Sequence, residues 1–287
     1  MGDESVLSTI QWGDTITHLS QQMKHLLEGT TLVKNGVVGK RTTMEQMAAR
    51  TFTKITQRHK PLTASDPDFR RRWITMFDYS DAALFDKQDD MKTAITDVKG
   101  ALNQGLMMGA NRLKDQVLID AFSATAYTGE DGTSTQAAGS AIANGGTGLT
   151  LAKLRTLNKT WLDNKVPLEE EKFMVISPAD HDDLLKITEI ISKDFNEGKP
   201  VLVDGHVKRF MGINFIITTQ LSTAAGVTSC YAWAKSGMGI AYALNWELTT
   251  AQRHDLTKAP WQAEASVSVG ATRLEEEKVL GCDTYHA

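Results

Sequence analysis

The sequence predicts an α+β fold in which an extended β-hairpin, a long helix, an α/β region and a β-rich end follow one another along the chain. Three observations support this prediction. Two β-type segments flank a turn-rich tip within residues 50–79, apolar residues recur at spacings of three and four through residues 88–123, and short apolar strands alternate with capped helices from residue 150 onward. The 287 residues, 41% of them hydrophobic, are enough for one large domain or two small ones.

The predicted hairpin joins a strand at 50–60, rich in Thr, Phe and Ile, to a second strand at 70–79. One face of the second strand carries four residues at period two: Trp73, Thr75, Phe77 and Tyr79. Residues 61–68 between the strands include two prolines and two aspartates, which are typical of a turn. Because an isolated hairpin is marginally stable in water, we expect it to pack against another part of the chain or against another chain.

The first 48 residues show mixed polarity and no sustained period, and Gly29, Gly36 and Gly39 interrupt them. A segment of this kind cannot bury an apolar face of its own, so we expect an arm, extended or partly helical, that docks elsewhere. The N-terminus lacks a basic stretch followed by an apolar run, so we expect no signal peptide.

A long helix is predicted over residues 88–123. Its apolar stripe consists of Met91, Ile95, Val98, Leu102, Leu106, Gly109, Leu113, Val117 and Ala121. About 35 residues at 1.5 Å each give a rod of roughly 50 Å, whereas helices of compact domains average about 11–12 residues. Residues 128–150, rich in Gly, Ser, Thr and Ala, are predicted to be a linker after this rod.

The α/β region is predicted from helix caps and short apolar runs. Thr150 is a suitable cap for a helix that contains Leu151, Leu154, Leu157 and Trp161. Ser177 and Pro178 suit the start of a second helix, with an apolar face formed by Leu184, Leu185, Ile191 and Phe195. Residues 173–177 and 212–218 are predicted to be buried strands.

The β-rich end is predicted to contain a hairpin and a long strand. Residues 231–235 and 238–245 form the hairpin around Ser236 and Gly237. Residues 261–271 alternate between apolar and polar side chains, which indicates a half-buried strand.

No motif of a known active site is present. The sequence has no P-loop, no GxSxG, no HExxH and no EF-hand loop, so we predict no enzyme, no catalytic or cofactor-binding residues and no cofactor. Cys230 and Cys282 lack the spacing of a zinc site and are expected to be reduced thiols. No apolar run approaches the roughly 18 residues of a membrane span, so no membrane association is expected.

One group of residues has the composition of a metal site, namely His181 with Asp180, Asp182 and Asp183. Consecutive residues of a helix point in different directions and do not converge on one ion. We therefore interpret this group as a charged first helical turn that faces solvent, and we predict no metal ligands.

Charge is unevenly distributed along the first third of the chain. Residues 50–73 carry seven basic and two acidic side chains, a net +5, whereas residues 78–97 carry two basic and six acidic ones, a net -4. Three interpretations remain open. Both segments are solvated surfaces, or the hairpin contacts nucleic acid with His59 and Trp73 as stacking partners, or the basic hairpin of one subunit lies over the acidic start of the rod of another.

The third interpretation defines a set of candidate contacts between subunits. On the hairpin they are Arg50, Lys54, Arg58, Arg70, Arg71, Arg72 and Trp73, and at the start of the rod they are Asp86, Asp89 and Asp90. The formal net charge of the whole chain is -4, which does not favour a general nucleic-acid binder.

The order of these parts resembles the major capsid proteins of tailed bacteriophages, the Hong Kong phage-type fold that is shared with encapsulin shells. Local strings also resemble that family: FMVISPADHDDLL at 173–185, LVDGHV at 202–207, MGINF at 211–215 and VGATR at 269–273. The resemblance extends over nearly the whole chain.

The resemblance implies a layout of domains. These are an N-terminal arm at 1–48, an extended hairpin loop at 49–80, a peripheral domain with the spine helix at 81–149, an axial domain at 150–225 and peripheral strands at 226–287. The hairpin would overlap a neighbouring subunit.

The resemblance also implies a function and partners. Copies would form pentamers and hexamers of an icosahedral shell, part of the virion and assembled in the host cytoplasm, with a separate scaffolding protein and a portal. The shell would enclose double-stranded DNA without sequence-specific binding. The alternatives are an encapsulin-like compartment and a soluble α/β enzyme with a dimerising hairpin; the missing active-site motifs count against the enzyme.

Overall fold

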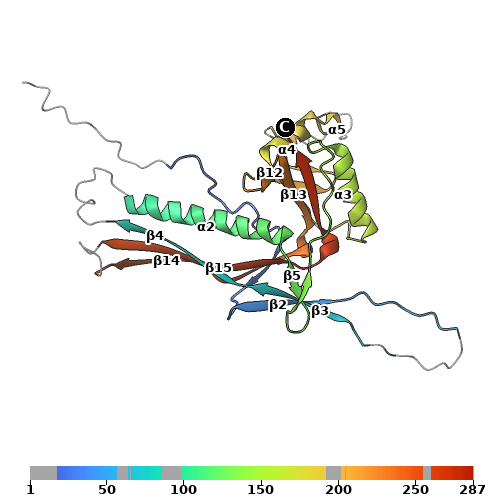
Figure 1. The fold of residues 1–287 in the computed structure, drawn as a ribbon, viewed down its shortest axis with the longest axis horizontal. Coiled ribbons are helices and arrows are strands. Elements are labelled where there is room, and N and C mark those ends of the chain that lie inside the picture. The colour runs from blue at the N-terminus through green and yellow to red at the C-terminus, as the bar shows by residue number, and fades with distance from the viewer. Residues whose placement is uncertain are drawn as a thin grey trace, which may run out of the picture. The chain divides into compact units, whose positions relative to one another are not determined.

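The computed structural model describes residues 18–56, 64, 66–85, 98–191, 202–203, 205–254 and 260–286 (Figure 1). The chain divides into two compact units. Unit 1 comprises Met1–His25, Asp78–Lys114 and Leu244–Ser268, and unit 2 comprises Leu26–Phe77, Asp115–Ala243 and Val269–Ala287.

Strands and helices keep the labels of Figure 1. In chain order the strands are β1 (Leu32–Asn35), β2 (Arg41–Met47), β3 (Phe69–Thr75), β4 (Phe77–Phe85), β5 (Ala126–Thr128), β6 (Ser134–Gln136), β7 (Lys172–Ile176), β8 (Leu202–Val203), β9 (His206–Val207), β10 (Arg209–Phe210), β11 (Ile213–Ile217), β12 (Thr223–Ala224), β13 (Val227–Ala234), β14 (Met238–Gln252), β15 (Trp261–Arg273) and β16 (Val279–Tyr285). The helices are α2 (Val98–Ser123), α3 (Leu151–Asp163), α4 (Pro178–Lys186) and α5 (Thr188–Ile191), with the 3₁₀ turns η2 (Lys235–Gly237) and η3 (Glu276–Lys278).

Unit 1 contains the first part of α2 and the portions of β4, β14 and β15 that lie beside it (Figure 1). Leu106 and Met108 on the helix and Val267 on β15 are buried. Arg112 on α2 donates to the side chain of Gln21 at 2.7 Å, so that a part of the N-terminal region runs along the helix. The prediction of a long helix is confirmed over 26 residues; its predicted first ten residues, 88–97, lie outside the described residues.

Unit 2 is built around a six-stranded mixed sheet in the order β10-β11-β7-β13-β12, with β16 also paired to β13. β7 and β11 are parallel, and β13 is antiparallel to both β7 and β16. β13 and β16 come from the segment 226–287, so the sheet takes strands from both sides of the predicted boundary at residue 225. Trp161 on α3 and Trp233 on β13 are fully buried and anchor the core.

The predicted starts of α3 and α4 are confirmed. The Thr150 side chain accepts a hydrogen bond from Lys153 N, and Leu154, Leu157 and Trp161 form the buried face of α3. Ser177 and Asp180 form a capping box at the start of α4, with Pro178 in the first turn. Each side chain satisfies backbone N–H groups that have no partner within the helix, which is why helices begin at these residues.

A second sheet of unit 2 has the order β2-β3-β5-β6. β2 pairs with β3 in antiparallel register from Arg41↔Thr75 to Met47↔Phe69. The predicted arm therefore contains strands that pair within the chain: β1 pairs in parallel with β14, and β2 pairs with β3.

The prediction of a first hairpin strand at 50–60 is wrong. Residues 51–56 form neither strand nor helix, and residues 57–60 lie outside the described residues. The partner of β3 is β2, about ten residues earlier than predicted. Thr- and Ile-rich composition favours a strand only where a partner edge is available, and here β2 already occupies that edge of β3.

The face of the predicted second strand that carries Trp73, Thr75, Phe77 and Tyr79 is not its buried face. Ile74 and Met76 are the buried residues, 0% and 9% exposed, whereas Phe77 is 58% exposed. Successive side chains of a strand point to opposite faces. The even-numbered residues Ile74 and Met76 therefore face the core, and the odd-numbered aromatic residues point to the other face.

The strands around Ser236 exist, but the predicted hairpin between them does not. β13 pairs in the six-stranded sheet, whereas β14 belongs to the sheet β1-β14-β15-β4. The 3₁₀ turn η2 moves the chain from one sheet to the other. The predicted strands at 173–177, 212–218 and 261–271 are confirmed within one or two residues. No helix in the described part of the chain is long and apolar enough to cross a membrane.

Candidate functional site

The loop that joins β2 to β3 leaves large apolar side chains uncovered. Its stem is closed by the hydrogen bond from Ala48 N to Asp68 O at 2.9 Å. Beyond this bond, Phe52 is 103% exposed and Ile55 is 74% exposed. Met47 at the stem is 61% exposed. Burial of apolar surface is favourable by about 25 cal/mol per Å². Contact of this loop with a partner would therefore be favourable.

The predicted basic contacts divide into two groups. Arg70 is exposed and lies 3.6 Å from the carboxylate of Asp68, and Lys54 is exposed on the loop. Arg71 pairs with Glu45 at 2.7 Å and keeps 39% of its side chain exposed. Ion pairs this open to water contribute little to stability, so these cations remain available to a partner.

Arg72 and Trp73, by contrast, are engaged within the chain. Arg72 Nε donates to Leu274 O at 3.0 Å, and its guanidinium lies 3.5 Å from Glu276. The indole of Trp73 donates to Gly129 O at 2.8 Å, and the ring packs so closely on Gly132 that a Cβ there would lie 2.9 Å from it. Neither side chain is free to stack on a nucleic-acid base.

Four predicted contact residues lie outside the described residues: Arg58, Asp86, Asp89 and Asp90. Arg50 is exposed, on the loop next to Lys54. The structure therefore brings Arg70, Arg71 and Arg72 together on β3, and it does not test their pairing with the acidic start of the rod.

A groove of about 870 Å³ runs beside β2, which sequence reasoning did not find. Its lining includes seven consecutive residues from Thr43 to Ala49. Arg70 and Arg72 of β3 and Leu274, Glu275, Glu277 and Lys278 also line it. The acidic run Glu275–Glu277 is a sequence signal near this groove, but it does not identify a groove by itself.

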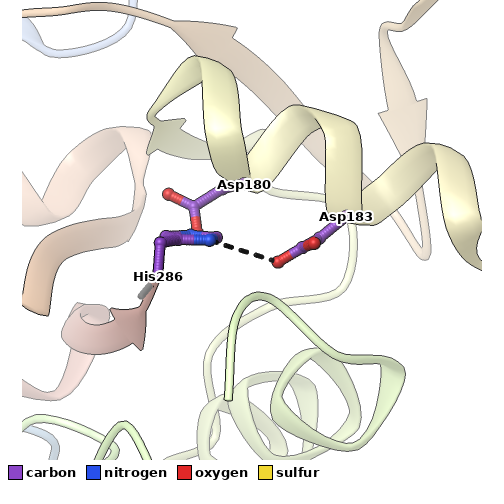
Figure 2. A group of neighbouring side chains, drawn as sticks. All are labelled: Asp180, Asp183 and His286. Carbon is purple, nitrogen blue, oxygen red and sulfur yellow. Dashed lines mark hydrogen bonds and ion pairs between the residues drawn. The ribbon is translucent and has the colours of Figure 1, made fainter. Parts of the chain in front are cut away.

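The interpretation of the first turn of α4 as a solvent-facing charged surface is wrong for two residues. Asp180 is 0% exposed and His181 is 9% exposed. Asp180 and Asp183 lie one turn apart on the same helix face and converge with His286, which follows β16 (Figure 2). His286 Nε2 lies 2.8 Å from Asp180 Oδ1, and Nδ1 lies 3.8 Å from Asp183 Oδ2.

The carboxylate of Asp180 is kept ionised by its hydrogen bonds. Burial raises its pKa, but hydrogen bonds from Ser177, His286 and Cys230 outweigh burial and hold the pKa below its ordinary value. Burial and the neighbouring Asp180 carboxylate raise the pKa of the Cys230 thiol well above its ordinary range.

These three side chains are of types that can hold a metal ion, and their donor atoms lie within 4.8 Å of one another. However, Asp180 Oδ2 already accepts from Ser177 N, Ser177 Oγ and Cys230 Sγ. The group of Asp180, Asp183 and His286, called the clasp below, therefore connects the end of β16 to α4 through polar contacts. Sequence reasoning missed His286 because it lies 106 residues from Asp180 and no local pattern connects them.

One comparison with known proteins identifies a family. The family model for phage capsid protein matches residues 8–284. No curated protein matches the sequence. Among solved structures, the chain is similar to the capsid of the cyanophage P-SCSP1u, with a TM-score of 0.76 and 14% identity over 99% of this chain and 94% of that chain.

Two further solved structures have the same fold. The capsid of Ralstonia phage GP4 has a TM-score of 0.72 and 12% identity, covering 98% of this chain and 96% of that chain. The capsid of a native GTA particle has a TM-score of 0.70 and 13% identity, with the same coverage of 98% and 96%. The family match over nearly the whole sequence shows that the chain belongs to the phage capsid protein family and is a major capsid protein of a phage head shell.

Proposed function

We propose that copies of this chain assemble as pentamers and hexamers into an icosahedral shell that encloses double-stranded DNA. The observation that carries the proposal is the loop between β2 and β3, on which Phe52 and Ile55 are 103% and 74% exposed. An extended segment with uncovered apolar side chains is completed by a neighbouring subunit. The net charge of -4 supports enclosure of DNA without sequence-specific binding.

The proposed domains follow the Hong Kong phage-type layout, with one adjustment. The arm is 1–48, the extended hairpin loop is 49–80, and the spine helix belongs to the peripheral domain at 81–149. The axial domain is built on the sheet that contains β7 and β11, and β13 and β16 join it because they pair in the same sheet. The long strands β14 and β15 belong to the peripheral domain.

We further propose that the basic stem of the loop lies over the acidic residues Asp86, Asp89 and Asp90, which precede α2 in the sequence, in a neighbouring subunit. Arg70, which is exposed, and Arg71, which is partly exposed, are the cations on β3 that support this docking. Opposite charges on two surfaces accelerate association and select the register of pairing. A separate scaffolding protein and a portal take part in assembly in the host cytoplasm.

Electron microscopy and sedimentation test the proposed assembly. The purified chain, alone or produced with its scaffolding protein, is expected to yield closed shells or the capsomers that form them. A stable monomer or dimer under all these conditions would overturn the proposal. Shells that contain a packaged enzyme instead of DNA when isolated from their native source would favour the encapsulin-like alternative.

A charge exchange tests the docking surface. Arg70→Glu combined with Arg71→Glu is expected to reduce shell yield at low salt, and Asp89→Lys combined with Asp90→Lys in the same chain is expected to restore it. Both effects shrink as salt rises, because screening weakens pairs of exposed charges. Absence of rescue would place the loop on another surface of the neighbour.

A further inference from the structure

His181 on α4 accepts a hydrogen bond from the backbone of β9. Its Nε2 atom lies 3.3 Å from Val207 N, and the two residues are 9% and 1% exposed. β8 and β9 pair in antiparallel register, with Leu202 opposite Val207. Because the N–H of Val207 points to His181, it points away from β8, and the imidazole is its acceptor. One side chain of α4 therefore holds a buried backbone donor of the β8–β9 pair.

The imidazole of His181 can accept this hydrogen bond only while it is neutral. A neutral ring has one N–H and one acceptor nitrogen, whereas both nitrogens of the charged ring are donors. Since Nε2 accepts from Val207, the ring proton is on Nδ1 in this arrangement. Protonation of Nε2 would place two donors opposite each other and leave a buried N–H without an acceptor, which is unfavourable.

The surroundings of His181 favour its neutral form. Burial lowers the pKa of His181 below its ordinary value of 6.5, and His206, whose ring centroid lies 5.5 Å from that of His181, lowers it further. Asp182 acts in the opposite direction, but it is exposed and its carboxylate is paired with Lys186 at 2.7 Å. Within the described residues, His206 of β9 and Asp182 of α4 itself are the titratable groups that act on His181.

The rest of α4 is held independently of this contact. The capping box of Ser177 and Asp180 fixes its first turn, and Leu184 is fully buried. His286 connects the same turn to the end of β16. Loss of the hydrogen bond from Val207 therefore frees β9 without removing the contacts that keep α4 in place.

We propose that His181 is a pH-sensitive latch that holds β9 against α4 in its neutral form and, on protonation, releases the β8–β9 pair while the six-stranded sheet stays folded. The pKa of His181 is lower in the closed arrangement than in the released one, so release is coupled to uptake of a proton. The closed contact is therefore fully stable above the ordinary value of 6.5 and is lost as the pH falls through the folded pKa. The inference concerns a single subunit and does not depend on shell assembly.

Amide hydrogen exchange in the dilute, unassembled full chain tests the latch. The protection of the Val207 amide, relative to its intrinsic exchange rate, is followed by NMR from about pH 7.5 to about pH 4.5. We expect constant protection above about pH 6.5 and, below it, a fall of about tenfold per pH unit until the folded pKa is reached, because opening takes up one proton. The amide of Val175, in the centre of the six-stranded sheet, should keep its protection.

His181→Gln is the matched variant, because a glutamine side-chain oxygen can accept from Val207 N and does not titrate. Its protection at Val207 should not depend on pH over the same range. His254→Gln, at an exposed position after β14, is the control and should show the same fall as the wild type. An equally steep fall in His181→Gln, or wild-type protection that does not change with pH, would overturn the latch.

Nitrogen-15 NMR of the histidine rings provides a second measurement that needs no variant. At about pH 7.5, Nε2 of His181 is expected to be unprotonated and Nδ1 to carry the proton. A ring that carries its proton on Nε2, or that is charged at this pH, cannot accept from Val207. Either result would contradict the inference even where His181→Gln fails to fold.

Discussion

Arg273 on β15 donates from its guanidinium to the carbonyl oxygen of Phe122, at the end of α2, at a distance of 2.8 Å. The same group also donates to the carbonyls of Ala121, Ala124 and Gln136. Arg273 is only 1% exposed, and Glu276 balances its charge at 2.7 Å. The last carbonyls of a helix have no partner within the helix, so one buried cation completes the end of α2 and joins it to β15.

Replacement of Arg273 is expected to be strongly destabilising. Arg273→Met leaves several buried carbonyls and the Glu276 carboxylate without their donor, and loss of one member of a buried pair costs about 3–5 kcal/mol. The free energy of unfolding, measured with urea, reports the change. Arg209→Met, at an exposed position of β10, is the control and should change it by less than about 0.5 kcal/mol. A loss of under about 1 kcal/mol for Arg273→Met would contradict the role in completing α2.

Gly270 is expected to tolerate no side chain. A Cβ at this position would overlap the backbone oxygen of Thr75, which cannot move aside as the end of a flexible side chain can. Gly270→Ala should therefore lower the unfolding free energy by about 1–3 kcal/mol. Gly139→Ala is the matched control, because nothing lies within 4 Å of its Cβ position. Equal thermal midpoints for the two variants would show that the strand shifts without cost.

Phe52 is expected to matter for assembly and not for folding. Its side chain is fully exposed in the subunit, so Phe52→Ser should leave the unfolding free energy within about 0.5 kcal/mol of the wild type. Shell yield by sedimentation should fall at least about tenfold, because one buried aromatic anchor contributes about 2 kcal/mol or more to an interface. Leu168→Ser, at a position that is 69% exposed outside the loop, serves as the control. An unchanged yield for Phe52→Ser would remove this residue from the interface.

The clasp at Asp180 predicts a specific pH dependence. The folded pKa of Asp180 lies below its ordinary value of 3.8, so the unfolded chain binds more protons near that pH. The stabilisation by the carboxylate is therefore fully present above about pH 4 and is lost as the pH falls through the folded pKa. Asp180→Asn should cost about 3 kcal/mol at neutral pH and clearly less at about pH 3.

Denaturant unfolding at the two pH values measures this difference. Asp182→Asn, on the exposed side of the same helical turn, is the control and should have a much smaller effect. A cost for Asp180→Asn that is equal at both pH values would mean that the carboxylate charge is not what stabilises the clasp.

The two cysteines are expected to be inert in the folded chain. Burial raises the pKa of Cys282 to about 12, and Cys230 is also fully buried. Since the thiolate is the reactive form, a colorimetric thiol reagent at about pH 8 should label neither thiol in the native protein and both in denaturant. Rapid labelling before unfolding would show that β13 and β16 open locally.

Local signals predicted the parts of the fold that depend on neighbours in the sequence. The caps at Thr150 and Ser177 and the buried strand at 173–177 were found because helix ends and apolar runs are set by a few adjacent residues. Pairing of strands was predicted less well. The β-type residues of 51–56 had to compete with β2 for the edge of β3, and composition does not decide such a competition.

The candidate sites depend on contacts between distant segments. Arg72 was expected on an outer surface, but Leu274, 202 residues away, supplies an acceptor for it. His286 meets Asp180 only after the sheet is assembled. By comparison, the sequence shows directly that the strand containing Arg70 and Arg71 is rich in charge. The exposure of these two side chains could therefore be predicted from it.

The pairing of β13 with β16 has a consequence for the order of folding. Asp283 of β16 accepts a hydrogen bond from Ser229 of β13, 54 residues earlier, and the two strands stay in register over their length. Between these two strands the chain forms β14 and β15, which belong to another sheet. Closing so long an interval is entropically costly, so we expect this ladder to form after the local helices. Until then β13 has an open edge, and newly made chains are most prone to aggregate in that interval.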